Sequence, residues 1–309
     1  MTTTSEYTCA ADWFQSAALL RYMGHLSCEK WPAPDAAPNG RPYTSSHLCE
    51  FITDGSPVHP LYWAHLSKEV AYGFAKTPPK GWNSWDVYGA SVTEEEVKRN
   101  ADIMAEKLKK YGWNYVVVDI QWYEPGAESA AYRKFADLKI DEYSRVLPAE
   151  NRFPSAAGGK GFREIADYIH GKGLKFGIHT MRGIPRQAVA KNVTIKGTSY
   201  TAHQVAHPAS ICCWNSDMYG VDSTQPGAQE YYDSILELYA SWGVDYIKVD
   251  DICVKYGRIN DEGTLQYGGD EIEMLHRAIE KCGRSIVLSL SPGPAMVEKA
   301  EHLRKYANL

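Results

Sequence analysis

One local unit recurs four times between residues 93 and 290: an amphipathic helix, then a glycine, then a short apolar strand. The first helix is predicted to start at Thr93, with Glu96 completing a capping box three residues later. Its apolar residues at helical spacing are Val97, Ala101, Met104 and Leu108. The strands are predicted over residues 115–119, 174–179, 244–250 and 285–290. Apolar strands that alternate with helices are typical of a parallel sheet covered by helices.

Two folds have this alternation, a doubly wound sheet and a (β/α)8 barrel of the TIM type. We predict the α/β barrel because polar residues end several strands, where barrel enzymes place their sites; they are Trp85, Asp119, His179, Asp250 and Ser291. The first strand also lacks the glycine-rich turn of a dinucleotide-binding fold. About five units are recognisable from Gly81 onward, fewer than the eight of a complete barrel, so the predicted barrel is partial.

The first 75 residues do not share this pattern. They are rich in Pro, His, Ser and aromatic residues, and the stretch from Pro32 to Tyr43 is predicted to be a linker or a long loop. We therefore divide the chain into an N-terminal segment of unassigned function, residues 1–75, and a partial barrel domain, residues 76–309.

Composition excludes some classes of partner. A net charge of -5 over 309 residues gives no reason to expect nucleic acid or an anionic membrane as a partner. No apolar run reaches the roughly 18 residues that a bilayer span needs. The N-terminus lacks the basic start and apolar stretch of a signal peptide, so a cytoplasmic location is expected. The 21 Tyr and 9 Trp permit a carbohydrate-binding protein, although aromatic residues also fill cores.

The segment Lys248-Val249-Asp250-Asp251 is the sharpest local feature of the chain. Residues two apart on a strand share a face, so Lys248 and Asp250 are expected to point the same way. A nearby ammonium keeps a carboxylate ionised, which is the state that a carboxylate nucleophile needs. A structural salt bridge is the alternative interpretation. Asp251 should face the other way, as a helix cap or loop anchor.

The other polar strand ends each have two interpretations. A charge at Asp119, after an apolar strand, requires either a site or an ion-pair partner. His179 could bind a sugar hydroxyl or be satisfied by a backbone carbonyl. A magnesium site built from three carboxylates is a further alternative; these would be Asp119, Asp250 and Asp251. Because Lys248 would repel the ion and no histidine-rich metal motif is present, we predict no metal.

Six segments of the chain resemble the melibiase or α-galactosidase family, glycoside hydrolase family 27. The first four match the family's strands in order and are 78–86 (PPKGWNSWD), 118–122 (VDIQW), 176–179 (FGIH) and 247–251 (IKVDD). Two more, 181–187 (MRGIPRQ) and 289–294 (SLSPGP), resemble a bacterial branch of that family. The resemblance covers about residues 76–309.

The resemblance implies a retaining glycosidase that cleaves terminal α-D-galactosides of oligosaccharides or glycoconjugates, without a metal or organic cofactor. Asp250 matches the family's nucleophile, and Lys248 matches the lysine beside it that contacts sugar hydroxyls. Trp85, Asp119 and His179 fall at sugar-contacting positions. Ser291 lies near the position that reads the substituent at sugar carbon 2.

Two departures from the family concern the sugar. His179 stands where many relatives have tyrosine, and Ile120 replaces an aspartate that in many members bonds a galactose hydroxyl. The resemblance therefore leaves β-L-arabinopyranosides and α-N-acetylgalactosaminides as competing substrates.

A third departure concerns the family's general acid/base, an aspartate on a later strand within a Trp-Arg-x-x-Asp-Asp-like motif. This sequence reaches Leu309 without that motif. We therefore expect a fragment of the barrel that is a poor enzyme by itself. Its open edges would favour pairing with a second copy, as a homo-oligomer. The alternative is a truncated or inactive barrel that only binds sugar.

Overall fold

The computed structural model of the protein describes residues 78–129, 131–259, 265–291 and 296–309. The chain divides into two compact units, one of residues 79–293 with 306–309, and one that includes residues 294–305. In the second unit, the described residues form the 3-10 helix η7 (Val297–Lys299) and most of α10 (Ala300–Tyr306). The main sheet, the helices beside it and the candidate site all belong to the first unit. The N-terminal segment predicted over residues 1–75 lies outside the described residues.

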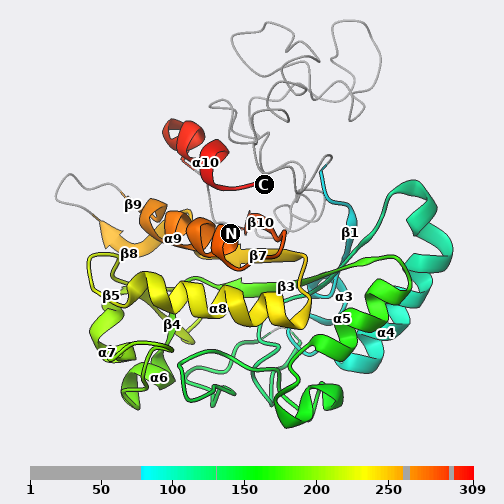
Figure 1. Ribbon diagram of the computed structural model, residues 1–309, viewed down its shortest axis with the longest axis horizontal. Helices are drawn as coiled ribbons and strands as arrows, with labels where there is room; N and C mark the ends of the chain where they lie inside the picture. Colours follow the sequence, from blue (N-terminus) through cyan, green and yellow to red (C-terminus); the bar gives the residue numbers. More distant parts are fainter. Residues whose placement is uncertain (1–77, 130, 260–264, 292–295) are drawn as a thin grey trace, which may run out of the picture. The chain divides into compact units, whose positions relative to one another are not determined.

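The main sheet consists of five parallel strands that lie in the order in which the chain forms them. They are β1 (Gly81–Asn83), β2 (Tyr115–Val118), β3 (Lys175–Met181), β7 (Tyr246–Asp250) and β10 (Val287–Ser291). A doubly wound sheet reverses its strand order at a switch point, whereas a barrel adds each strand beside the preceding one. The sequential order confirms the predicted partial (β/α)8 barrel; Figure 1 labels four of these strands, β1, β3, β7 and β10.

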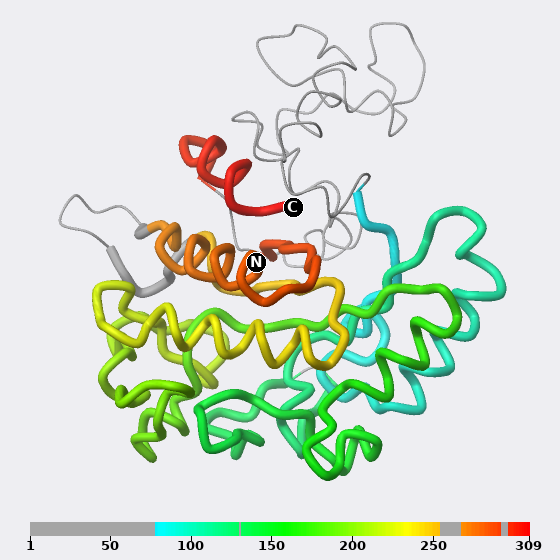
Figure 2. The backbone as a smooth tube through the Cα atoms, in the orientation of Figure 1, coloured from blue at the N-terminus to red at the C-terminus, as the bar shows by residue number. Residues whose placement is uncertain are grey.

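The helices between these strands pack against one another in the same order. They are α4 (Glu94–Ile103), α5 (Arg163–Gly171), α8 (Ala228–Trp242) and α9 (Gly269–Lys281), and each contacts the next. Figure 2 shows α8 and α9, in yellow and orange, running side by side. The predicted capping box is present at the start of α4, where Glu96 Oε2 accepts hydrogen bonds from the backbone N–H and hydroxyl of Thr93.

The first helix ends differently from the prediction. Helix α4 stops at Ile103, and the chain continues as a π-helical turn, η4 (Met104–Leu108), and a 3-10 turn, η5 (Lys109–Tyr111). Val97, Ala101 and Met104 are buried as predicted, but Leu108 is exposed. A π turn holds more residues than an α turn, so the spacing that would bring Leu108 to the buried face no longer applies.

Short elements that the sequence did not predict are inserted between the strands and helices of the main sheet. Between β3 and α8 lie β4 (Ile184–Pro185), α6 (Arg186–Ala190), α7 (Ala202–Val205), β5 (Ala206–Ile211) and β6 (Met218–Val221). Strands β4, β6 and β5 pair antiparallel in that order, and β8 (Val254–Ile259) pairs antiparallel with β9 (Leu265–Tyr267). Before the second and third strands lie α3 (Trp85–Tyr88) and the 3-10 turns η6 (Pro154–Gly159). These insertions bring further side chains to the carboxyl ends of the strands.

An aromatic cluster fills the space between β2, β3 and the helices. Trp122 is fully buried and packs edge-on against Phe162, Tyr239 and Trp242. Its indole Nε1 donates a hydrogen bond of 2.7 Å to the backbone carbonyl of His179. The core therefore fixes the backbone of the strand that presents His179. Among the described residues, no helix is both long and apolar enough to cross a membrane.

Candidate active site

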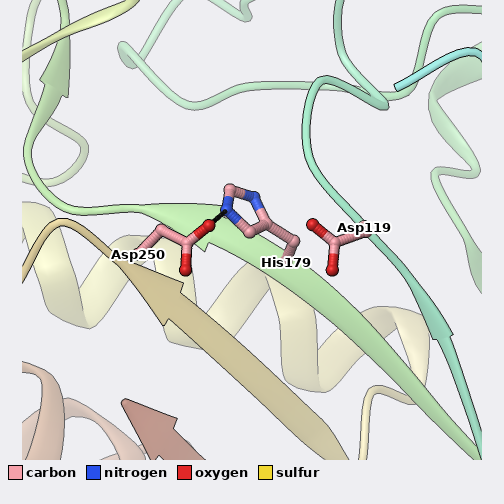
Figure 3. A group of neighbouring side chains, drawn as sticks. All are labelled: Asp119, His179 and Asp250. Atoms are coloured by element: carbon pink, nitrogen blue, oxygen red, sulfur yellow. Dashed lines mark hydrogen bonds and ion pairs between the residues drawn. The ribbon is translucent and has the colours of Figure 1, made fainter. Parts of the chain in front are cut away.

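Three charged or titratable side chains meet at the carboxyl ends of adjacent strands. Asp119 follows β2, His179 lies in β3, and Asp250 ends β7. Figure 3 shows the three side chains gathered above the strands, with the imidazole of His179 between the two carboxylates in that view. The parallel register pairs His179 with Lys248, which brings a fourth side chain to the same place.

Lys248 connects the two carboxylates. Its Nζ lies 2.9 Å from Asp119 Oδ2 and 3.6 Å from Asp250 Oδ2, and the side chain is almost completely buried. Burial alone would lower the pKa of Lys248, but the charges of Asp119 and Asp250 raise it well above its ordinary value. The ammonium therefore stays charged beside both carboxylates. This geometry confirms that Lys248 and Asp250 share one face of their strand.

Asp250 is held ionised by its neighbours. Burial would raise the pKa of Asp250, but Lys248 and His179 lower it to about 2, with help from a hydrogen bond from Ser291. The imidazole Nε2 lies 2.9 Å from Asp250 Oδ2, the bond drawn in Figure 3. Ser291 stands directly beside Asp250 in the paired strands β10 and β7. Asp250 thus stays ionised across the ordinary pH range.

The two imidazole nitrogens of His179 differ in their hydrogen bonding: Nε2 is bonded to Asp250, and Nδ1 has no partner among the described residues. Since Asp250 is ionised, Nε2 carries the proton of their hydrogen bond. The ring is fully buried, and its Nδ1 finds no hydrogen-bond partner within the described part of the chain. A buried ring nitrogen without a partner is rare in folded proteins, and it leaves a hydrogen-bonding position for a ligand hydroxyl.

Asp119 is fixed from several directions. Asn83 Nδ2 and Lys248 Nζ donate to Asp119 Oδ2 at 2.6 and 2.9 Å, and the backbone N–H of Ile120 donates to Oδ1 at 2.7 Å. The backbone N–H of Asp119 donates to Ser84 Oγ at 2.8 Å. Burial would raise the pKa of Asp119, but Lys248 and then His179 lower it. Asp119 therefore serves as a rigid, ionised acceptor.

Trp85 lies in contact with two residues that the sequence did not identify. Its ring stacks on Tyr132, with centroids 5.8 Å apart and planes at 24°, and Tyr132 contacts Trp214 at 5.6 Å. Burial, followed by the charges of Asp119 and Asp250, raises the pKa of Tyr132 well above its ordinary range. The charges of both carboxylates therefore act on Tyr132. Because it lies on an irregular loop 13 residues after Asp119, no periodicity marks it in the sequence.

Asp251 faces away from this group, as predicted, and belongs to a second buried network. Its backbone has a left-handed φ of 59°, which turns the chain directly after Asp250. Arg182 Nη2 lies 2.6 Å from Asp251 Oδ2, and Arg182 Nη1 lies 3.3 Å from Glu271 Oε1. The backbone N–H of Arg182 also donates to the carbonyl of Asp250, at 3.1 Å. Arg182 thus connects the backbone of Asp250 to the buried pair of Asp251 and Glu271.

The three carboxylates that we considered as a magnesium site do not converge, because Asp251 binds Arg182 instead. A different group has suitable spacing: ligand atoms of Asp119, His179 and Asp250 all lie within 4.8 Å of one another. Lys248 already places a positive charge between these carboxylates. The electrostatics therefore disfavour a second cation at this place.

Comparison with known proteins points to one family. The sequence model of the alpha galactosidase A family, the melibiases, matches residues 77–225. The α-galactosidase of Coffea arabica is 28% identical over 222 residues, which cover 72% of this chain and 43% of that protein. The α-galactosidase A of Cellvibrio japonicus is 30% identical over 219 residues, covering 70% of this chain and 38% of that protein.

Two solved bacterial structures are more similar to this chain in sequence. A family 27 β-L-arabinopyranosidase from Geobacillus stearothermophilus is 59% identical, with a TM-score of 0.73, over 79% of this chain and 53% of that one. A candidate α-N-acetylgalactosaminidase from Bacillus halodurans is 61% identical, with a TM-score of 0.65, over 71% of this chain and 50% of that one.

This chain thus spans about half the length of these solved relatives, and less than half of the two curated α-galactosidases. Within that span, the matched profile, the identity to the solved structures and the sequential parallel sheet agree with one another. The chain is thus similar to glycoside hydrolase family 27, the α-galactosidase family, over part of that family's barrel.

Proposed function

We propose that the protein is a retaining glycosidase that cleaves terminal α-D-galactosides, with Asp250 as the nucleophile. One observation carries the proposal: a carboxylate with a pKa of about 2 stands between a buried ammonium and a buried imidazole, at the carboxyl ends of barrel strands. That is the position where barrel enzymes hold their reacting groups. The family relatives, which include α-galactosidases, support this assignment.

In the proposed reaction, Asp250 attacks the anomeric carbon and forms a covalent glycosyl–enzyme as the bond to the leaving oxygen breaks. Lys248 and Asp119 hold the sugar's hydroxyl groups, and His179 Nδ1 forms a hydrogen bond with a further hydroxyl. Water then attacks the same carbon and releases the sugar with its original configuration.

A second carboxyl group must protonate the leaving oxygen, about 5–5.5 Å from the nucleophile in retaining enzymes. Asp119 is unsuited because its pKa is lowered and its oxygens already accept three hydrogen bonds. Burial raises the pKa of Asp251 to about 6, but that side chain is turned into the Arg182 network. The proposal therefore assigns the general acid to a residue outside the strands described here.

A second candidate substrate, a β-L-arabinopyranoside, is favoured by Ile120. This sugar has the ring configuration of an α-D-galactoside but lacks the exocyclic hydroxymethyl group. Ile120 is 1% exposed and directly follows Asp119, where many relatives carry an aspartate. An isoleucine offers no hydrogen bond to a hydroxymethyl group, whereas its apolar surface tolerates the group's absence. The 59% identity to a β-L-arabinopyranosidase supports the same alternative.

Ile120→Asp tests both the reaction and the sugar. The unsubstituted protein is expected to hydrolyse p-nitrophenyl α-D-galactoside and the matching β-L-arabinopyranoside with weak discrimination. Ile120→Asp should shift the ratio of their kcat/KM values toward the galactoside by roughly 10-fold to 100-fold, the usual worth of one hydrogen bond made to a substrate hydroxyl.

A second variant, Ile120→Asn, has a side chain of the same size as aspartate and offers a hydrogen bond without a charge. It should shift the ratio of the kcat/KM values in the same direction, which separates the hydrogen bond from the charge. Strong galactoside preference in the unsubstituted protein, unaffected by Ile120→Asp, would contradict the role of this residue. Hydrolysis of neither aryl glycoside would contradict the proposed function itself.

A further inference from the structure

We propose that Tyr132 and Trp214, which together with Trp85 are called here the aromatic row, bind the second pyranose ring of the substrate, the one attached to the leaving oxygen, while Trp85 contacts the first. This inference rests on the proposed function, because it requires the first sugar to lie at Asp250. It assigns a binding role to Tyr132 and Trp214 and extends the site beyond the sugar that is cleaved.

The three rings of the aromatic row contact one another in sequence. Trp85 and Tyr132 are nearly parallel, with centroids 5.8 Å apart. Tyr132 and Trp214 follow at 5.6 Å, with their planes at 45°. The three rings together extend over a length greater than one sugar ring, since each centroid spacing is itself about the width of a pyranose.

The inner end of the aromatic row is anchored beside the catalytic carboxylates. Asn83 Oδ1 accepts a hydrogen bond of 2.8 Å from the backbone N–H of Trp85, while Asn83 Nδ2 donates to Asp119 at 2.6 Å. One asparagine side chain thus connects the first ring of the row to the carboxylate that Lys248 shares with Asp250.

The outer end is held by a buried hydrogen-bond cluster on the loop that carries Trp214. Asp217 Oδ2 accepts hydrogen bonds of 3.0 Å from both Gln121 Nε2 and Tyr123 OH, which belong to the segment after β2. Ser216 Oγ accepts one of 2.7 Å from the backbone N–H of Phe135, near Tyr132 in the chain. Both loops are therefore fixed relative to β2, and a pre-positioned platform binds a ligand at a low entropic cost.

The exposure of the row argues against a purely structural role. Trp85 is 37% exposed and Trp214 is 40% exposed, whereas the core tryptophan Trp122 is fully buried. Large aromatic surfaces that stay open to water and lie next to a reactive site are typical of binding surfaces. A pyranose ring suits them because its C–H faces cover an aromatic ring while its hydroxyl groups remain hydrated.

The test compares a one-ring ligand with a two-ring ligand, in the Asp250→Asn variant so that neither is cleaved. Calorimetry should show that melibiose binds more tightly than methyl α-D-galactoside, and Trp214→Ala should weaken melibiose binding roughly 10-fold. The affinity for methyl α-D-galactoside should change less than twofold. Trp113→Ala is the matched control, because Trp113 is 42% exposed but precedes β2, at the opposite end of the strand. It should change neither affinity.

Three results would overturn the inference. Equal weakening of both ligands by Trp214→Ala would indicate a structural role, and no weakening of melibiose would remove Trp214 from the site. If methyl α-D-galactoside binds but melibiose binds no more tightly, the inference fails while the proposed function stands. If neither ligand binds Asp250→Asn, the proposed function fails together with the inference.

Discussion

Asp250→Asn is expected to lower kcat for an activated aryl α-D-galactoside by roughly four orders of magnitude or more, as removal of a catalytic nucleophile does. The amide keeps the shape of the side chain and its contact with His179 but loses the anionic oxygen. An aryl group with a low pKa leaves without needing a proton, so the assay reports on the nucleophile alone. The matched control is Asp167→Asn, an exposed carboxylate on α5.

Replacing Asp250 with a residue that has no side chain distinguishes a nucleophile from a residue that merely orients the substrate. In Asp250→Gly, added azide should occupy the vacated space and attack the anomeric carbon. The new C–N bond forms as the bond to the aryl oxygen breaks, which releases a phenolate and yields β-galactosyl azide. Rate recovery with azide is expected for Asp250→Gly and not for Asp119→Gly. A loss of less than 10-fold in Asp250→Asn, or no azide product, would remove Asp250 from this role.

Arg182→Ala is expected to reduce the free energy of unfolding by about 3–5 kcal/mol, as removal of one partner from a buried ion pair typically does. Arg182 is 2% exposed, and its loss would leave Asp251 and Glu271 buried without their cation. Urea unfolding monitored by circular dichroism measures the change. The control Arg163→Ala removes an exposed guanidinium on α5 and should have little effect.

The cause of that loss can be tested separately. If the uncompensated charge is responsible, Arg182→Met combined with Asp251→Asn and Glu271→Gln should recover most of the lost stability, since a neutral buried group avoids the cost of an unpaired ion. A triple variant as unstable as Arg182→Ala would instead indicate lost packing. A loss below 1 kcal/mol for Arg182→Ala would show that the network adds little to the fold.

The main sheet was predictable because its strands are buried on both faces. Strand β2 is buried at all four positions, so its sequence is a continuous apolar run that stands out between two helices. The inserted sheet of β4, β6 and β5 has no such signal. In β5, the three consecutive residues His207, Pro208 and Ala209 are exposed or half-buried, so no continuous apolar run marks this strand in the sequence.

The candidate site was predictable where it follows strand geometry and unpredictable where it depends on loops. Lys248 and Asp250 share a face because a strand repeats every two residues, and Ser291 reaches Asp250 through strand register. Tyr132 and Trp214 meet only because two loops, about 80 residues apart in the chain, fold together. Arg182 was visible within a family-like segment, but its role depends on tertiary contacts with Asp251 and Glu271.

The most direct test of the central assignment is to identify the residue that becomes covalently bound to the sugar. The protein would be incubated with a fluorinated galactosyl donor whose glycosyl–enzyme forms quickly and hydrolyses slowly, then digested and mapped by mass spectrometry. We expect one added galactosyl group per chain, on the peptide that contains Asp250, and none in Asp250→Asn. A label on Asp119 or another carboxylate, with Asp250 unmodified, would contradict it.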